Sequence, residues 1–448
     1  MTSLLIRNAK IVNENSIEEK DVFIQGNLIH TIGTHLKNIA DITIEGQGLY
    51  LLPGLIDDQV HFREPGFTYK GSIWSESRAA IAGGVTTYME MPNTFPPTTT
   101  IELLEEKYKI AAQNSFANYS FFLGATNDNL SELLKLDLNQ NCGVKVFMGS
   151  STGSLLVDSE EALEAIFSQV PALIATHCED ENTIKNNMLF YTANWGEKLC
   201  AEYHPQIRSR QACWLSTYKA IQLAQKYNTR LHVLHISTQE ELNLFNNKIP
   251  ISEKRITAEA CIHHLWFSKE DYAQLGNLIK WNPAIKNATD REALRKAVRN
   301  NTIDVIATDH APHALEEKQQ PYISAPSGGP LVQHALLALL ELHKKGVFTL
   351  EEIVNKTSHN VAICFKIQKR GFIREGYYAD LVLVDLNTTQ KVTKKNLLYH
   401  CQWSPFEGQI FNSTILYTIL NGQIVYHNGK ILGKPSGKRI EFYTSQED

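Results

Sequence analysis

The sequence predicts an α/β fold: a (β/α)8 barrel accompanied by a small β-sandwich domain that both ends of the chain build together. Two observations lead to this prediction. The middle of the chain alternates short apolar runs with helix-like stretches, whereas both ends carry β-branched residues punctuated by glycine. Alternating strands and helices are typical of a parallel sheet covered by helices, and eight such units close a barrel.

The barrel prediction depends on apolar runs of strand length. They are Leu55–His61, Val85–Met91, Tyr119–Gly124, Val144–Met148, Ala172–His177, Leu231–Ile236, Ile256–Cys261 and Ile303–Thr308. Helix-like stretches lie between many of them, namely SIWSESRAAIAGG, IELLEEKYKIAAQN, SEEALEAIFSQV and TDREALRKAVRN. A doubly wound sheet has the same alternation, so the pattern favours a barrel but leaves that alternative open.

The two ends of the chain are predicted to form short strands joined by turns. At the N-terminus these are LLIRNAKIV, DVFIQGNLIHTIG and ADITIEGQGLYLLPG. At the C-terminus they are GFIREGYYADLVLVDL and STILYTILNGQIVYHNGKIL, with turns at NG and HNG. We therefore expect residues 1–53 and 369–448 to form one β-sandwich domain and residues 54–368 to form the barrel.

Composition restricts the class of function. The 448 residues are 20% charged and 43% hydrophobic, which is typical of a globular protein, and the net charge of −5 gives no electrostatic case for nucleic acid. No stretch approaches the roughly 20 apolar residues of a membrane helix, and the N-terminus is not a secretory signal. Seven cysteines are scattered without a CxxC pair. These features predict a cytoplasmic protein that acts on a small molecule.

Polar residues stand where several of the predicted strands stop. In a barrel the C-terminal ends of the strands form one face, where catalytic residues gather. Three histidines, a carboxylate and a lysine there are suitable ligands for zinc or a similar divalent ion. The residues at or within the runs are His61, Asn93, Lys145, His177, His235 and Asp309.

Each of these residues also has a structural interpretation. A lone histidine at a strand end is often a hydrogen-bonded structural residue, Lys145 could be a surface lysine, and Asp309 could cap the next helix. The coincidence of all of them at strand ends favours a site. The remaining histidines that we interpret as surface or loop residues are His30, His35, His204, His400 and His427.

Seven motifs in order resemble the dihydroorotases of the amidohydrolase superfamily. They are PGLIDDQVHFREPG, MEMPNT, THCED, LHVLHIS, KWNPAIK, DVIATDHAPH and APSGG. The resemblance covers nearly the whole chain, and HFREPG with MPNT and DHAPH is highly specific. It implies reversible hydrolysis of (S)-dihydroorotate to N-carbamoyl-L-aspartate, a step of de novo pyrimidine biosynthesis.

The resemblance also implies a metal centre. His61, His177 and His235 would bind one or two zinc ions, and Asp309 would contact the metal and act as general acid and base. Lys145 matches a lysine that some members carry as a carbamate. Burial favours the neutral amine that captures CO₂.

Substrate recognition would depend on a second group of residues. Arg63, Asn93 and His313 match positions that hold the substrate carboxylate, a task for which the planar guanidinium of arginine is well shaped. The pyrimidine ring would be contacted at Asn282 and near Ser327 and Gly328.

Two departures from the family pattern concern the metals. Gln59 stands where the family usually has the first histidine of an HxH pair, and a neutral amide oxygen is a much poorer zinc ligand than imidazole. One tightly held ion and two ions with an altered first site both stay open. Some bacterial dihydroorotases bridge their metals with an Asp further along the loop after Lys145, where this chain has GSSTG.

The sequence leaves two rival functions open. Another cyclic amidase (dihydropyrimidinase, hydantoinase or allantoinase) shares the fold and metal, but its substrate lacks the carboxylate that Arg63 would read. A metal-poor homologue that acts as a binding partner, for instance of aspartate transcarbamoylase, is supported by Gln59 alone. The oligomeric state is also open, with a homodimer as one expected form.

Overall fold

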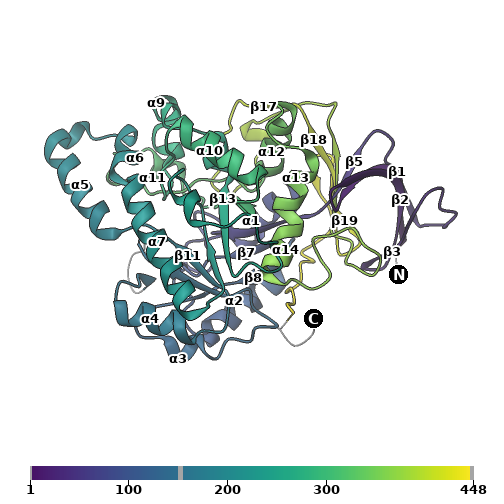
Figure 1. Ribbon diagram of the computed structural model, residues 1–448. Helices are drawn as coiled ribbons and strands as arrows, with labels where there is room; N and C mark the ends of the chain where they lie inside the picture. The colour runs from purple at the N-terminus through teal and green to yellow at the C-terminus, as the bar shows by residue number, and fades with distance from the viewer. Residues whose placement is uncertain (1–2, 150–154, 444–448) are drawn as a thin grey trace.

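The computed structural model describes residues 3–149 and 155–443, and it contains the predicted barrel (Figure 1). Its strands are β6 (Leu55–Val60), β7 (Val85–Glu90), β8 (Asn118–Phe121), β9 (Leu123–Gly124), β10 (Val144–Phe147), β11 (Ile174–His177), β12 (Leu231–Val233), β13 (Ile256–Cys261) and β14 (Val305–Ala307). Successive strands pair in parallel from β6 to β8 and from β9 to β14. Every apolar run predicted as a strand therefore contains one.

Two short links close the barrel. Phe122, between β8 and β9, donates its backbone N–H to Glu90 O, so β8 and β9 continue one another along the wall. On the other side Val60 at the end of β6 forms a parallel bridge with His310, just beyond β14. A closed wall brings all the strand ends to one rim. The doubly wound alternative is thereby excluded.

Helices cover the outside of the barrel. The predicted stretches form α1 (Ile73–Ala82), α2 (Ile101–Asn114), α4 (Glu160–Gln169) and α10 (Ala288–Arg299), and further helices include α5 (Glu181–Trp195), α7 (Arg210–Tyr227), α12 (Ala335–Lys344) and α14 (Asn360–Phe365). Ser72, Thr100 and Ser159 start three of them because each hydroxyl accepts a backbone N–H of the first turn. Among the described residues, no helix combines the length and apolar character needed to span a bilayer.

The interior of the barrel is plugged at one end. Ile56, Met89, Phe122 and Val305 form a buried cluster that α14 covers with Phe365. Phe365 packs edge-on against Phe122, with ring centroids 6.2 Å apart. Because Ile56 and Val305 stand at the beginnings of β6 and β14, the opposite rim, where the strands end, is the one left for a site.

The β-rich ends of the chain form one sheet. Within the described residues its order is β20-β19-β18-β15-β5-β1-β2-β3, with β4 against β1. The strands are β1 (Ser3–Asn13), β2 (Ser16–Gln25), β3 (Leu28–Gly33), β4 (Ile42–Glu45), β5 (Tyr50–Pro53), β15 (Leu381–Asp385), β18 (Thr414–Leu420), β19 (Gln423–His427) and β20 (Lys430–Ile431). Figure 1 shows the purple and yellow ends side by side, and β5 pairs antiparallel with β15.

The sheet supports the division that we propose, with a sandwich from 1–53 and 369–448 and a barrel from 54–368. One segment crosses this division. Tyr119 in β8 exchanges backbone hydrogen bonds with Lys438 and Ile440, and Phe442 forms a bridge with Ile367. The end of the described chain thus packs on the barrel after leaving the sheet.

Candidate active site

All the residues that the sequence singled out line one cavity of about 330 Å³ at the C-terminal rim of the barrel. They come from β6, β10 and β11 and from the segments that follow β6, β7, β12, β13 and β14. They are Gln59, His61, Arg63, Asn93, Lys145, His177, His235, Asn282, Asp309, His313, Ser327 and Gly328. Phe147, Trp281, Ala311 and Pro326 complete the lining.

His177 and His235 form the deepest pair of imidazoles at this cavity. His177 Nδ1 lies 2.9 Å from His235 Nε2, and His177 Nε2 lies 2.9 Å from the Glu179 carboxylate. Glu179 is itself held by Arg208. Because Nε2–H donates to Glu179, the lone pair of His177 is on Nδ1 and points at His235. A carboxylate behind the ring is the arrangement that orients a metal-binding histidine.

His61 is oriented in the same manner by an amide. Its Nδ1 lies 2.7 Å from Asn93 Oδ1, which can only accept, so Nδ1 carries the proton. Nε2 then presents its lone pair to Asp309 Oδ1, 3.2 Å away. A lone pair and a carboxylate repel unless a cation lies between them. Burial lowers the pKa of His61, of His177 and of His235, which favours the neutral rings that metals require. These donors therefore fit a divalent ion.

Lys145 points from β10 into the same cavity and is almost fully buried. Burial lowers the pKa of its amine to about 8. Among the described residues no hydrogen bond or ion pair engages Nζ, which lies 4.6 Å from the Phe147 ring centroid. A buried amine of low pKa without an acceptor is suited to carboxylation. The GSSTG stretch that follows falls mostly on residues 150–154, outside the described chain.

Gln59 is at the cavity floor and is turned toward β13. Cys261 donates its Sγ–H to Gln59 Oε1, with the atoms 3.4 Å apart, and also lies 3.2 Å from Glu259 Oε1. The amide oxygen therefore has a protein partner. Gln59 lines the cavity beside His61, but this contact makes it a weaker candidate ligand than the three histidines.

Arg63 and His313 form an unusual pair of donors at the mouth of the cavity. His313 Nδ1 lies 3.0 Å from the Lys70 ammonium and Nε2 lies 2.9 Å from Ser327 O, so the ring proton is on Nε2. Arg63 Nη2 nevertheless lies only 3.0 Å from that nitrogen. Two N–H donors face each other without an acceptor between them. Burial lowers the pKa of Arg63 to about 10, which still leaves the guanidinium charged at neutral pH.

The wall of the cavity formed by Asn282 and Gly328 provides a hydrogen-bond acceptor and a backbone segment without a side chain. Asn282 Oδ1 is buried without a hydrogen-bond partner among the described residues. Gly328 has a φ of 122°, and a Cβ there would lie 2.6 Å from Ala311 O. Glycine is required at this point because both the backbone angle and the space exclude a side chain.

Three residues of the cavity have left-handed backbone although they are not glycine. They are Arg63 (φ 74°), His235 (φ 40°) and Asp309 (φ 47°). Such conformations cost roughly 1–3 kcal/mol each and gather at functional sites. The surrounding hydrogen bonds offset this cost. Glu259 accepts the His235 N–H at 2.8 Å, and Trp281 donates to Asp309 O at 3.3 Å.

One prediction about the histidines is wrong. His204 is buried, not on the surface, and its ring bridges Tyr322 Oη at 2.8 Å and Trp281 O at 2.7 Å. It therefore supports the Trp281 wall of the cavity. Glu179 and Lys70, which orient His177 and His313, were also missed, although Glu179 stands inside the quoted THCED motif.

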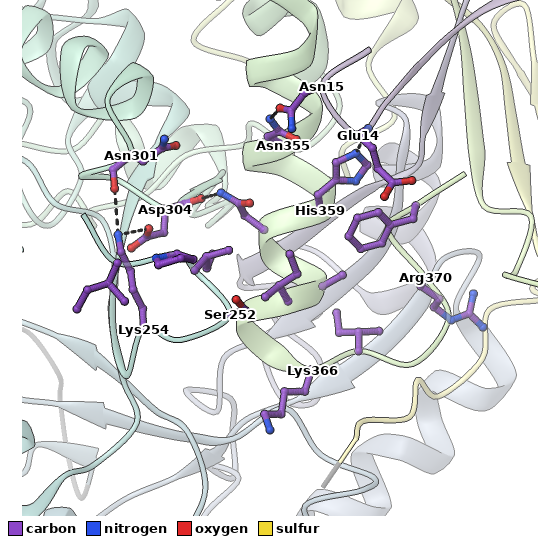
Figure 2. A pocket seen from close by; sticks show the side chains of 18 of the residues that line it. Glu14, Asn15, Ser252, Lys254, Asn301, Asp304, Asn355, His359, Lys366 and Arg370 are labelled. Carbon is purple, nitrogen blue, oxygen red and sulfur yellow. Dashed lines mark hydrogen bonds and ion pairs between the residues drawn. The ribbon is translucent and has the colours of Figure 1, made fainter. Parts of the chain in front are cut away.

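The structure also contains a larger cleft of about 820 Å³ on the opposite side of the barrel (Figure 2). Lys254 and Asp304, which precede β13 and β14, line it, so it opens at the beginnings of the strands. Its labelled polar groups are largely paired with one another: Lys254 donates to Asp304 and to Asn301, and Glu14 N–H donates to His359. The rim cavity is the one that gathers the predicted site residues.

Comparison with known proteins agrees with this geometry. The amidohydrolase family model matches residues 50–425. A dihydroorotase from Methanosarcina acetivorans is 31% identical and aligns over 98% of this chain and 97% of its own. A dihydroorotase from Pyrococcus horikoshii is 32% identical over 90% of this chain and 87% of its own.

Solved structures give the same result for the fold. An L-hydantoinase (dihydropyrimidinase) from Arthrobacter aurescens is 25% identical, with a TM-score of 0.93 over 98% of this chain and 100% of that one. A dihydropyrimidinase from Brevibacillus agri is 24% identical and has a TM-score of 0.89 over 99% of this chain and 100% of that one. This chain therefore belongs to the amidohydrolase family, in which the dihydroorotases are its relatives by sequence.

Proposed function

We propose that the protein is a dihydroorotase, which hydrolyses dihydroorotate to N-carbamoyl-L-aspartate and closes the ring in the reverse direction. The family and the dihydroorotase relatives make it a metal-dependent cyclic amide hydrolase. The observation that carries the choice of substrate is the donor pair formed by Arg63 and His313.

The donor pair is suited to a carboxylate. Arg63 Nη2 lies 3.0 Å from His313 Nε2, whose own proton already goes to Ser327 O, so this contact gives the guanidinium no acceptor. An anionic oxygen placed here would supply one and could share the His313 proton. The charge of Arg63 adds a charge-assisted hydrogen bond, which is stronger than a neutral one. Hydantoin and dihydrouracil carry no carboxylate, so neither would place an anionic oxygen against this pair. It therefore supports dihydroorotate over the substrates of the solved neighbours.

The opposite wall is suited to the ring. Asn282 Oδ1 lacks a donor among the described residues, and a ring N–H would supply one. Ser327 O already accepts from His313, so it fixes the carboxylate-binding donor relative to the ring. Asn93 contributes its oxygen to His61, which leaves its amide N–H group for the substrate.

The metal would be held by His61, His177, His235 and Asp309, with Lys145 as a carboxylated ligand. Zinc, as one ion or two, matches these nitrogen and oxygen donors. When bound, it polarises the ring carbonyl and supplies hydroxide near neutral pH. Asp309 lies 3.2 Å from His61, and its carboxylate would take the proton of the nucleophile and return it to the ring nitrogen.

The test is a panel of cyclic amides. We expect turnover of dihydroorotate and carbamoyl aspartate, with little turnover of dihydrouracil, hydantoin and allantoin. A protein that opens hydantoin faster than dihydroorotate would replace this proposal with the hydantoinase alternative. A protein that is purified with little metal and turns over none of them would favour the binding-partner alternative. We further propose that it acts in the cytoplasm; a homodimer stays a prediction.

A further inference from the structure

A second cluster of ligand-type side chains lies inside the barrel, below the cavity. Asp58 on β6, His232 on β12 and Glu259 on β13 are fully buried, and one ligand atom from each lies within 4.8 Å of the others. In the barrel wall β13 and β14 separate β12 from β6. The side chains of Asp58 and His232 can therefore meet only across the interior.

The ring of His232 is fixed with one nitrogen toward the carboxylates. Its Nδ1 lies 2.7 Å from the Thr257 hydroxyl, which donates its own proton to Leu231 O. The hydroxyl has a single proton, so when that proton goes to Leu231 O the ring donates to the hydroxyl from Nδ1. Nε2 faces Asp58 Oδ2 at 3.0 Å and Glu259 Oε2 at 3.7 Å. A hydrogen bond behind the ring that directs the other nitrogen forward is the arrangement found around metal-binding histidines.

The two carboxylates share one ionisable partner among the described residues, the His232 ring, which leaves one negative charge unpaired when both are ionised. Within the described chain, Asp58 Oδ1 and Glu259 Oε2 accept no hydrogen bond, and neither carboxylate pairs with a lysine or arginine. An ionised carboxylate in the interior is costly unless it is paired or coordinates a metal. Two carboxylates and one imidazole carry a charge that a divalent cation would neutralise.

This cluster is distinct from the proposed catalytic ligands but connected to them. Asp58 precedes His61 by three residues and His232 precedes His235 by three, which is about 10 Å along a strand. Glu259 contacts both the cluster and the proposed catalytic ligand His235. Its Oε2 faces the cluster, and its Oε1 accepts the backbone N–H of His235 at 2.8 Å. An ion on Glu259 would thus hold His235 in its left-handed conformation.

We propose that Asp58, His232 and Glu259 bind a divalent transition-metal ion of the zinc class in the barrel core. This ion is structural: it joins β6, β12 and β13 beneath the cavity and positions His235. One nitrogen and two oxygen ligands suit zinc or manganese better than magnesium or calcium. The proposal does not depend on which cyclic amide the enzyme opens.

Anomalous diffraction from crystals of the full protein, purified without added metal, tests the proposal directly. Data collected above and below the metal absorption edge should show a peak about 2.0–2.2 Å from His232 Nε2 and from an oxygen of Asp58 or Glu259. Peaks beside His61, His177 and His235 report on the catalytic site and are judged separately. A map with catalytic peaks, no interior peak and direct Asp58–His232 contact would overturn the proposal.

Metal counting in variants gives an independent test. Asp58→Asn removes one charge without changing the size of the side chain, and it should lower the metal content by one ion per chain. Asp57→Asn is the matched control, because Asp57 is a neighbouring buried carboxylate whose oxygens accept from Thr308 N and Oγ1. The control should keep the full content. Equal metal content in the wild type and in Asp58→Asn would refute the interior site. If the variant does not fold, the diffraction experiment on the wild-type protein still tests the proposal.

Discussion

At the scale of single residues, the candidate site is defined by hydrogen bonds that decide which ring nitrogen carries a proton. Asn93 turns the lone pair of His61 toward Asp309, and Glu179 turns that of His177 toward His235. These tautomers follow from partners that can only accept. The ligand set therefore depends on supporting residues as much as on the ligands themselves.

Asp309→Asn should remove nearly all turnover while metal is partly retained. The amide keeps an oxygen for the metal but cannot move a proton, and general acid–base catalysis contributes about 10²–10⁴-fold. Steady-state kcat and the metal content of the same preparation measure the two effects. If the variant keeps most of the wild-type rate, another residue is the base.

Arg63→Met should selectively weaken the reaction of substrates that carry a carboxylate. Loss of one partner of a buried charged hydrogen bond costs about 2–5 kcal/mol, so kcat/KM for dihydroorotate should fall by at least about thirtyfold. Any residual activity on dihydrouracil, which lacks the carboxylate, is the internal control and should hardly change. Equal damage to both substrates would mean that Arg63 shapes the cavity mouth rather than reading the substrate.

Lys145 should carry a carboxyl group in a high-resolution density map. Lys280 is the matched control, because burial lowers the pKa of both amines to about 8. The amine of Lys280 donates to Tyr322 O and Ala325 O, whereas that of Lys145 has no acceptor among the described residues. We expect extra density on Lys145 alone. An unmodified amine turned away from the metal would contradict the prediction.

At the scale of elements, the proposed substrate contacts come from the loops after the strands. The loop after β6 provides Arg63, and the segment between β14 and α12 provides His313 and Gly328. Their relative position is set by Arg63 Nε donating to Pro312 O at 2.9 Å and by the close approach of Gly328 to Ala311. The donor pair is thus a product of two loops that lie far apart in the sequence.

Gly328→Ala should raise KM for dihydroorotate several-fold or more. The new Cβ would lie 2.6 Å from Ala311 O and 3.3 Å from His313 Cδ2, so the loop must shift. Gly346→Ala is the control, because Gly346 also has positive φ (73°) but has open space around it and lies beyond α12. Both variants carry backbone strain of about 1–3 kcal/mol. An identical KM in both would show that the loop tolerates the shift.

At the scale of the whole molecule, the proposed metal ligands connect strands from different parts of the chain. His61 follows β6, His177 ends β11, His235 follows β12 and Asp309 follows β14. An ion held by them links the rim across the barrel. Ligand binding to the folded state alone also stabilises that state.

Extended chelation should therefore abolish ring opening and lower Tm together. Stabilisation by a ligand at about 100 times its Kd is roughly 2.7 kcal/mol, which a thermal melt resolves. Zinc or manganese should restore both properties, whereas magnesium should not, because imidazole nitrogens are poor magnesium ligands. Full activity in a preparation shown by elemental analysis to be metal-free would rule out the metal requirement.

The sequence by itself predicted the barrel over a doubly wound sheet, the β domain built from both ends, and the residues that line the rim cavity. It could do so because strand ends converge in a parallel barrel, so that residues such as His61 and Asp309 meet although they stand far apart in the chain. The family motifs then indicated further residues of the cavity, including Asn282 and Gly328, which the periodicity of the sequence does not indicate.

Only the tertiary structure decided what faces the interior. Asp57 and Asp58 are adjacent acids in one apolar run, yet Asp57 bonds to Thr308 and Asp58 points at His232. The register of β6 against β7 shifts between Asp57 and Val60, and no local pattern announces such an irregularity. His204 was misjudged for a similar reason. Its burial depends on Tyr322 and Trp281. The residues next to His204 in the sequence do not indicate contacts with such distant partners.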